Sequence, residues 1–129
     1  MSTDTDSIVR ELKDRQDILD CLVRYCRGMD RFDRELLRSA YHDDALDDHG
    51  DFVGSVDDFI DFYFNYHDTY QTRTVHALSN HSCELDGDVA HTETYWTFTA
   101  VNREAPFHSR ATGRYIDRLE KRDGRWAIA

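Results

Sequence analysis

The chain contains a single proline, and no run of apolar residues approaches the ~20 that a membrane-spanning helix needs. Basic residues are also few, since 16 Lys and Arg stand against 26 Asp and Glu and give a formal net charge of −10. A surface this acidic repels phosphate backbones and anionic lipids, so neither nucleic acid nor a membrane is an expected partner. The N-terminal residues are polar and acidic and do not resemble a signal peptide, so we expect a cytoplasmic protein.

Cysteine is scarce as well, with only Cys21, Cys26 and Cys83 in the chain. The odd number and the absence of a CxxC pair argue against a disulfide framework and a zinc ribbon. Cys21 and Cys26 lie within an apolar helical pattern and are predicted to be small core residues. The chain also lacks the GxSxG, GxGxxG and phosphate-loop motifs, so none of those catalytic classes is indicated.

The length and composition that are present indicate one soluble globular domain. A chain of 129 residues with 40% hydrophobic side chains can bury one core but not two. We therefore predict a single domain over residues 1–129, in which the small polar residues 1–6 are disordered. Aromatic residues make up 12% of the chain, which is enough to fill a core and to line a ligand cavity.

The first half of the chain has helical periodicity. A long helix is predicted from Ser7, which can cap it, to Asp30, with an apolar stripe of Ile8, Leu12, Leu19, Leu22, Cys26 and Met29. Asp33 is the predicted cap of a short second helix. Ser55, followed three residues later by an aspartate, resembles a capping box and predicts a third helix.

From Thr72 onward the periodicity changes to two, which is typical of strands. Asp86-Gly87 indicates a tight hairpin. Helices followed by an antiparallel meander predict an α+β fold with the helices on one face of a curved sheet. The chain stops in mid-strand, so we expect either a short last strand or a longer natural sequence. The predicted strands are residues 74–85, 89–101, 107–120 and 125–129.

The local sequence pattern indicates Asp30 and His76 as candidate site residues. Asp30 is either a helix-end residue or a partly buried carboxylate, and a buried carboxylate needs a partner. Alternation places His76 and His81 on opposite faces of the first long strand, and a β-bulge would exchange those faces. The pattern alone leaves open which face packs against the helices.

The segment between the second and third predicted helices is rich in acids and histidines. It contains neither an HExxH motif nor a calcium-binding loop, so we interpret it as a solvated acidic segment without a metal site. Its residues are His42, Asp43, Asp44, Asp47, Asp48 and His49.

Three segments, in order, resemble the SnoaL-like family of the nuclear transport factor 2-like superfamily. They are RYCRGMDRFDRELLRSAYHDDA (24–45), TVHALSNHSCELDGDVAHTETYW (74–96) and GRYIDRLEKRDGRWAI (113–128). The resemblance implies a cone-shaped curved sheet that is closed by helices and encloses an apolar cavity. It also implies a homo-oligomer, either a trimer or a dimer.

In several members of that family an aspartate and a histidine act together without a cofactor, and the matching residues here are Asp30 and His76. The resemblance adds Tyr25, five residues before the aspartate. It implies a dehydratase, isomerase or cyclase in which His76 takes a proton from a small apolar cyclic molecule such as a steroid or a polyketide. The predicted cavity walls are Phe59, Tyr63, Trp96 and Phe98, although plain core packing would also explain them.

Two other functions are compatible with the same residues, because one fold serves many functions. In the first, the chain binds a small molecule without chemistry and Asp30–His76 is a buried ion pair. In the second, it is the accessory small (β) subunit of a ring-hydroxylating dioxygenase.

Overall fold

The computed structural model describes residues 2–129, and its first element is a 29-residue helix, α1 (Ser2–Asp30). The helix ends at Asp30, as predicted, but it begins five residues before Ser7. It therefore includes residues 2–6, for which we predicted disorder, while Met1 lies outside the described residues. Asp4 in the first turn interacts favourably with the helix dipole, which helps to explain the longer helix.

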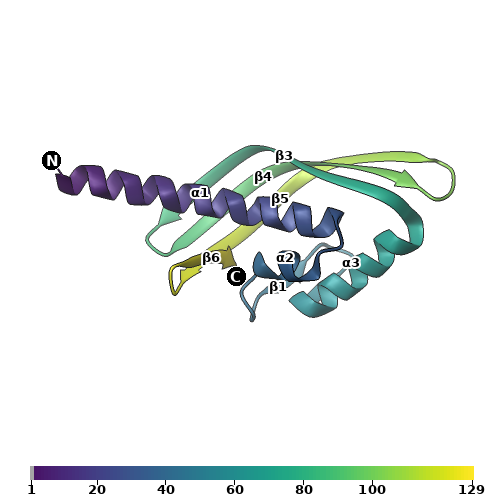
Figure 1. Ribbon diagram of the computed structural model, residues 1–129, viewed down its shortest axis with the longest axis horizontal. Coiled ribbons are helices and arrows are strands. Elements are labelled where there is room, and N and C mark those ends of the chain that lie inside the picture. Colours follow the sequence, from purple (N-terminus) through teal and green to yellow (C-terminus); the bar gives the residue numbers. More distant parts are fainter. Residues whose placement is uncertain (1) are drawn as a thin grey trace.

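Only the C-terminal part of α1 packs against the rest of the molecule. Ile18, Leu22 and Met29 are buried, whereas Ile8 and Leu12 are 57% and 61% exposed. Figure 1 shows the reason, since the first turns of α1 extend beyond the end of the sheet. The predicted apolar stripe is therefore correct in period, but its first two members are exposed. Leu19 is only half-buried, and its neighbour Ile18 takes the core position.

Two shorter helices, α2 (Arg34–Ser39) and α3 (Val56–Tyr70), follow α1. Asp33 Oδ1 accepts a hydrogen bond from the Leu36 amide at 3.0 Å, and Ser55 Oγ accepts one from the Asp58 amide at 3.3 Å. These two predicted caps are confirmed, because each side chain satisfies an amide that has no partner inside its helix. The third predicted cap, Ser7, is wrong, because it lies inside α1.

Gly28 allows α1 and α2 to approach closely. A Cβ atom at this position would lie 2.6 Å from the Leu37 backbone nitrogen, which is closer than real side chains come. Glycine lowers helix propensity, but here its missing side chain is what brings α2 against the end of α1. The position of Asp30 in the fold depends on this contact, since it lies two residues further along.

The second half of the chain is one antiparallel sheet in the order β3-β4-β5-β6. Its strands are β3 (Gln71–Asp86), β4 (Val89–Asn102), β5 (His108–Arg122) and β6 (Arg125–Ile128). The sheet curls strongly, and the helices lie on its concave side (Figure 1). The α+β cone is confirmed, and the last strand is short, with four residues.

A small ribbon connects α2 to α3. It consists of β1 (Leu46–Asp48) and β2 (Val53–Ser55), which pair antiparallel. A parallel bridge between Tyr41 and Ile128 ties the start of this region to the last strand of the sheet. The segment interpreted as solvated is therefore anchored at both of its ends.

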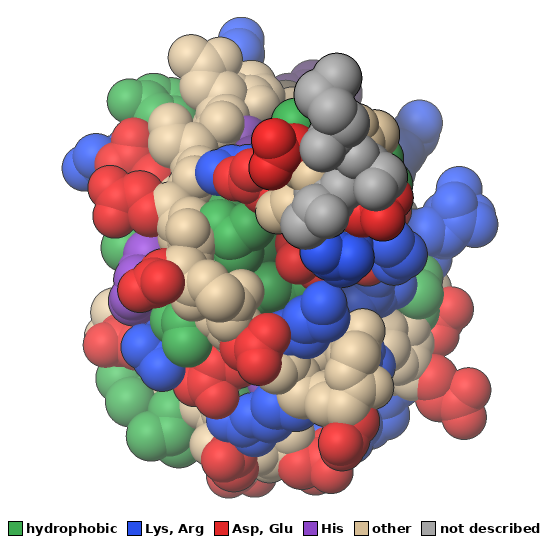
Figure 2. All heavy atoms as spheres, turned by 90° about the vertical axis from the view of Figure 1, so that its left-hand side faces the viewer, with side chains coloured by type: hydrophobic (Ala, Val, Ile, Leu, Met, Phe, Trp, Pro, Cys, Tyr) green, Lys and Arg blue, Asp and Glu red, His purple; other side chains and the backbone are tan. Residues whose placement is uncertain are grey.

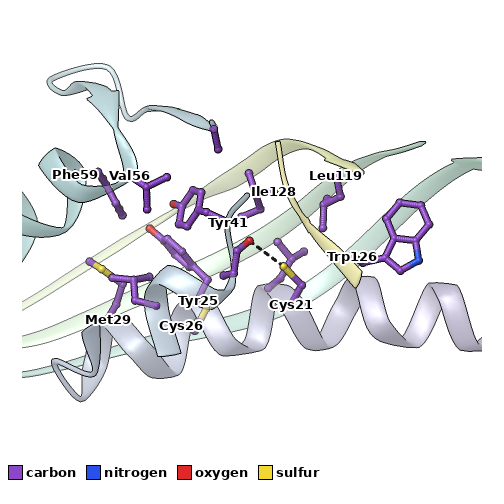
Figure 3. Close-up of a cluster of buried hydrophobic side chains, with 14 of the residues drawn as sticks. Cys21, Tyr25, Cys26, Met29, Tyr41, Val56, Phe59, Leu119, Trp126 and Ile128 are labelled. Carbon is purple, nitrogen blue, oxygen red and sulfur yellow. Dashed lines mark hydrogen bonds between the residues drawn. The ribbon is translucent and has the colours of Figure 1, made fainter. Parts of the chain in front are cut away.

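The core lies between α1 and the sheet. Figure 3 shows Tyr25, Met29 and Phe59 at one end of this cluster and Leu119 and Trp126 at the other. Cys21 and Cys26 are buried in it, as predicted, and the Cys21 thiol donates to the Ala40 carbonyl oxygen at 3.2 Å.

The surface at the α1 end of the molecule carries charges of both signs. Figure 2 shows Lys and Arg side chains interspersed with Asp and Glu there, and ion pairs such as Arg15–Glu11 and Lys121–Asp14 account for part of the pattern. Several Lys and Arg side chains adjoin one another near the middle of this view, with Asp and Glu side chains around them. None of the helices in the described part of the chain is long and apolar enough to cross a membrane.

Candidate active site

A β-bulge in β3 decides which histidines face the helices. The pairing of β3 with β4 shifts between Leu78 and His81. Before the shift Thr74, His76 and Leu78 point inward, and after it His81 and Leu85 do. The extra residue reverses the alternation, so His76 and His81 lie on the same face. Simple alternation therefore assigned them wrongly to opposite faces.

His76 and Asp30 are in direct contact. His76 Nδ1 lies 2.6 Å from Asp30 Oδ1, and the two side chains are 9% and 19% exposed. The His76 backbone amide donates to Asp30 Oδ2 at 2.8 Å, and the Thr74 hydroxyl donates to Oδ1 at 3.0 Å. Three donors thus hold the carboxylate at the point where α1 ends against β3.

These contacts define the tautomer of the imidazole. An ionised carboxylate only accepts hydrogen bonds, so Nδ1 of His76 carries the proton that it donates to Asp30. In the neutral ring Nε2 is then unprotonated and has a free lone pair. A histidine held in this way can accept a proton at Nε2 while the carboxylate stabilises the resulting imidazolium.

His76 lines a cavity of about 240 Å³ between the helices and the sheet. Of the predicted wall residues, Tyr63, Trp96 and Phe98 line it, and Tyr25 does as well. Phe59 does not, because it is fully buried behind His49, with ring centroids 4.9 Å apart. The remaining lining residues are Met29, His49, Asp51, Phe62, Tyr66, His67 and Tyr115.

Tyr25 lies on the inner face of α1 and is 4% exposed. Its ring meets that of His76 edge to face, with centroids 6.4 Å apart. Burial, and then the neighbouring Tyr115 and Tyr41, raise the pKa of Tyr25 well above its usual value. The phenol therefore keeps its proton and can donate it as a hydrogen bond.

A second carboxylate–imidazole pair, Asp47 and His49, lies beside the same cavity. His49 Nδ1 bonds Asp47 Oδ1, and His49 Nε2 lies 3.1 Å from the Tyr25 hydroxyl. Asp47 is only 7% exposed, so our interpretation of this segment as solvated is wrong at these positions. Their spacing of two residues was the available signal, since it puts both side chains on one side of an extended segment.

His67 is a further residue that the sequence interpretation missed. It is buried on α3, its Nδ1 bonds Gln71 Oε1, and its ring lies edge to face with that of His76. Burial lowers the pKa of His67, which keeps this neighbour of His76 uncharged. Its position after Ile60, Tyr63 and Phe64 fits the inward stripe of an amphipathic helix, and that spacing could have identified it.

His81, the alternative to His76, does not line the cavity. Its Nδ1 bonds the Thr94 hydroxyl at 2.8 Å, and burial lowers the pKa of this imidazole. Within residues 2–129, no three His, Cys, Asp or Glu side chains come together in a way that would hold a metal ion.

Comparisons with known proteins place this geometry in context. Residues 10–129 match the family model described as SnoaL-like domain. No curated protein sequence matches the chain.

Many solved structures are similar in fold, and three of them show the range of this likeness. A variant of Rv3472 from Mycobacterium tuberculosis, of unknown function, has 25% identity and a TM-score of 0.81, over 95% of this chain and 71% of its own. A hexachlorocyclohexane dehydrochlorinase (LinA) of type 2 has 21% identity and a TM-score of 0.84, over 93% and 83%. A nuclear transport factor 2-like superfamily protein from Salmonella enterica has 23% identity and a TM-score of 0.76, over 88% and 84%.

Proposed function

This chain belongs to the SnoaL-like domain family, and we propose that it is a cofactor-independent lyase or isomerase in which His76 removes a proton from carbon. The observation that carries this proposal is the 2.6 Å contact between Asp30 Oδ1 and His76 Nδ1 at the wall of a cavity. A base of this kind contributes roughly 10²–10⁴-fold to the rate of a proton transfer.

Each group has a distinct part in the proposed reaction. His76 Nε2 takes the proton, and Asp30 holds the ring in the required tautomer and balances the imidazolium charge. Phe98, with its ring centroid 4.8 Å from that of His76, and the uncharged His67 limit the access of water to the base. Tyr25 donates a hydrogen bond to the oxygen that becomes negative as the C–H bond breaks.

The size of the cavity narrows the proposed substrate. About 240 Å³ is less than the ~300–1,000 Å³ of typical ligand pockets, so a molecule with one or two rings fits better than a complete steroid. Aromatic side chains provide most of the lining, which suits an apolar ring. The dehydrochlorinase named above acts, by its name, on a chlorinated cyclohexane, and this likeness supports an elimination from a small cyclic molecule.

A general base in an apolar cavity can be tested with a substrate that needs only a base. Nitrobenzisoxazole is such a probe, because loss of its ring proton opens the N–O bond and releases a coloured phenolate. We expect His76→Ala to reduce the rate of this reaction by about 10²–10⁴-fold. His91→Ala is the matched control, since His91 is an exposed histidine on β4 and should leave the rate unchanged.

Circular dichroism and binding of the probe product complete this experiment. A catalytic His76 predicts lost turnover with the fold and the product affinity retained. Equal rates for His76→Ala and His91→Ala would refute the proposal. Loss of folding stability with no separate effect on turnover would instead identify Asp30–His76 as a structural ion pair.

The proposal also covers the domain organisation, the location and the assembly of the protein. We propose one domain over the whole chain, a cytoplasmic location, and a homo-oligomer of two or three copies. Light scattering of the purified protein tests the assembly, and a monomer at micromolar concentration would contradict it.

A further inference from the structure

We propose that Asp47 and His49 form a proton relay that makes Tyr25 the acid of the site, opposite the base His76. This inference rests on the proposed function, because a relay to Tyr25 serves a reaction only if His76 removes a proton from the same substrate. Tyr25 would touch the substrate, whereas Asp47 and His49 act through Tyr25 and are positioning residues.

A continuous set of hydrogen bonds carries the inference. The Tyr41 hydroxyl donates to Asp47 Oδ2 at 2.6 Å, and the other oxygen of that carboxylate bonds His49 Nδ1. Since Nδ1 of His49 must then carry a proton, Nε2 of the neutral ring accepts from the Tyr25 hydroxyl at 3.1 Å. The arrangement repeats the order carboxylate, imidazole and reacting group that orients a histidine for proton transfer.

The relay ends at the cavity and not elsewhere on the surface. Tyr25, His49 and His76 all line the same space, and the His49 side chain is 27% exposed, which gives it access to solvent protons. The ring of His49 is held by aromatic contacts with Phe59 and Tyr63 of α3. The titratable groups around His49 come from several elements. They are Asp47 on β1, Tyr25 on α1, Asp51 in the turn between β1 and β2, Tyr63 on α3, and Tyr115 and Asp117 on β5.

Protonation of His49 would reverse the direction of its bond to Tyr25. An imidazolium donates from Nε2, so the phenol oxygen becomes the acceptor and its own hydrogen turns toward the cavity. In the proposed step, His76 Nε2 takes the substrate proton and the C–H electron pair forms the new double bond. The bond from carbon to the leaving oxygen breaks, that oxygen takes the Tyr25 proton, and Tyr25 takes the Nε2 proton of His49.

The balance of this step defines the kind of substrate. His49 begins as the imidazolium and ends neutral, while His76 does the reverse, so the net charge of the site does not change. A proton delivered through Tyr25 lowers the barrier only where the leaving group would otherwise depart as a strong base. We therefore expect a substrate that loses a hydroxyl group as water, in preference to one that releases a weakly basic halide.

Leaving-group dependence tests the relay. Nitrobenzisoxazole releases a stable phenolate and needs little acid assistance, whereas unsubstituted benzisoxazole releases a more basic one. In His49→Gln, the amide can still hold Tyr25 but cannot pass on a proton. We expect its rate on the unsubstituted compound to fall by about 10²-fold, at the lower end of general acid contributions, with most of the rate on the nitro compound retained.

The outcomes separate this inference from the function it rests on. If His49→Gln lowers both rates equally, or neither, the relay is overturned while the role of His76 stands. If His76→Ala has no effect on either compound, the proposed function itself fails. Nitrogen-15 NMR of the wild-type imidazoles gives a test that does not depend on a folded variant. The relay requires Nδ1–H in neutral His49, and an Nε2–H form alone would overturn it.

Discussion

The two carboxylate–imidazole pairs beside the cavity are built in different ways. Asp30 and His76 are 46 residues apart and meet because α1 ends against β3, where the carboxylate receives two side-chain donors and one backbone amide. Asp47 and His49 are two residues apart, on and just after the three-residue strand β1. The first pair is fixed by the whole fold, whereas the second depends on a short segment and on Tyr41.

This difference assigns the pairs to different tasks. A base that removes a proton from carbon must be held in one place, and the His76 side chain is only 9% exposed. A group that exchanges protons with solvent needs access to it, and the His49 side chain is 27% exposed. The tasks that we propose for His76 and His49 follow from this contrast, and four predictions test it.

The largest expected effect is the difference in turnover between replacing the Asp30 carboxylate and replacing the Asp47 carboxylate. Asp30→Asn removes the charge that stabilises the His76 imidazolium, and we expect turnover of nitrobenzisoxazole to fall by about 10²–10⁴-fold. Asp47→Asn should leave most of that rate, because this probe needs little acid. Steady-state rates of the two variants, measured side by side, make the comparison. Equal losses would mean that the pairs have no separate tasks.

The next effect concerns Asp117, which shares its surroundings with the second pair only. Burial, and then the nearby Asp47, raise the pKa of Asp117 from 3.8 to about 6, while His49 opposes the rise. The folded protein therefore binds more protons than the unfolded chain between these values, so stability falls as pH rises through that window. Above about pH 6 this loss of unfolding free energy is complete. A pKa shift of this size corresponds to a loss of roughly 3 kcal/mol at most.

Asp117→Asn should remove this loss. We expect the variant to be more stable than the wild type above about pH 6 and equal to it near pH 4, because the wild-type acid is then mostly neutral. Urea unfolding across that range provides the measurement. A constant difference between the two proteins at every pH would show that Asp117 is not the titrating group.

A smaller effect is expected at Gly28, which lets α2 pack against the end of α1 close to the first pair. In Gly28→Ala, the new methyl group meets the backbone of Leu37, and we expect a loss of about 2 kcal/mol as the two helices separate. The displacement should also lower turnover, since Asp30 follows two residues later. Arg27→Ala, on the exposed face of the same turn, is the control and should change stability by less than about 0.5 kcal/mol.

The smallest effect concerns the anchors of the two carboxylates. Thr74→Val removes one donor to Asp30 and Tyr41→Phe removes the donor to Asp47, with little change in shape. Each should reduce the free energy of unfolding by about 1 kcal/mol. Because Asp30 keeps its backbone donor, we expect Thr74→Val to perturb the tautomer of His76 less than Tyr41→Phe perturbs that of His49. Nitrogen-15 NMR of the imidazoles measures the tautomer of His76 in Thr74→Val and that of His49 in Tyr41→Phe. A larger change at His76 than at His49 would contradict the proposed difference between the two pairs.

Local features of the fold were predictable because local chemistry decides them. The end of α1 at Asp30, the caps Asp33 and Ser55, and the hairpin at Asp86-Gly87 each depend on a few neighbouring residues. The contact of Asp30 with His76 was expected only through the family resemblance. Nothing in the residues between them specifies that α1 and β3 meet at that point.

The missed features depend on tertiary structure. The bulge in β3 reverses the facing of His81, and no glycine or proline marks it. Asp47 is buried with hydrogen bonds to Tyr41 and His49, although its segment has the composition of a solvated loop. Ile8 and Leu12 have the period of core residues, yet the sheet that would cover them ends earlier. Periodicity identifies an apolar face but not the length of its partner.

The Asp30 carboxylate bonds both the main-chain amide and the ring of His76, and this has a mechanical consequence. Because both bonds run from α1 to the same residue of β3, α1 cannot slide along β3 at this point without breaking them. The walls that come from α3, including Phe62, Tyr63 and Tyr66, take no part in these two bonds. A change in the distance between base and carboxylate therefore requires the loss of a main-chain hydrogen bond as well as a side-chain one.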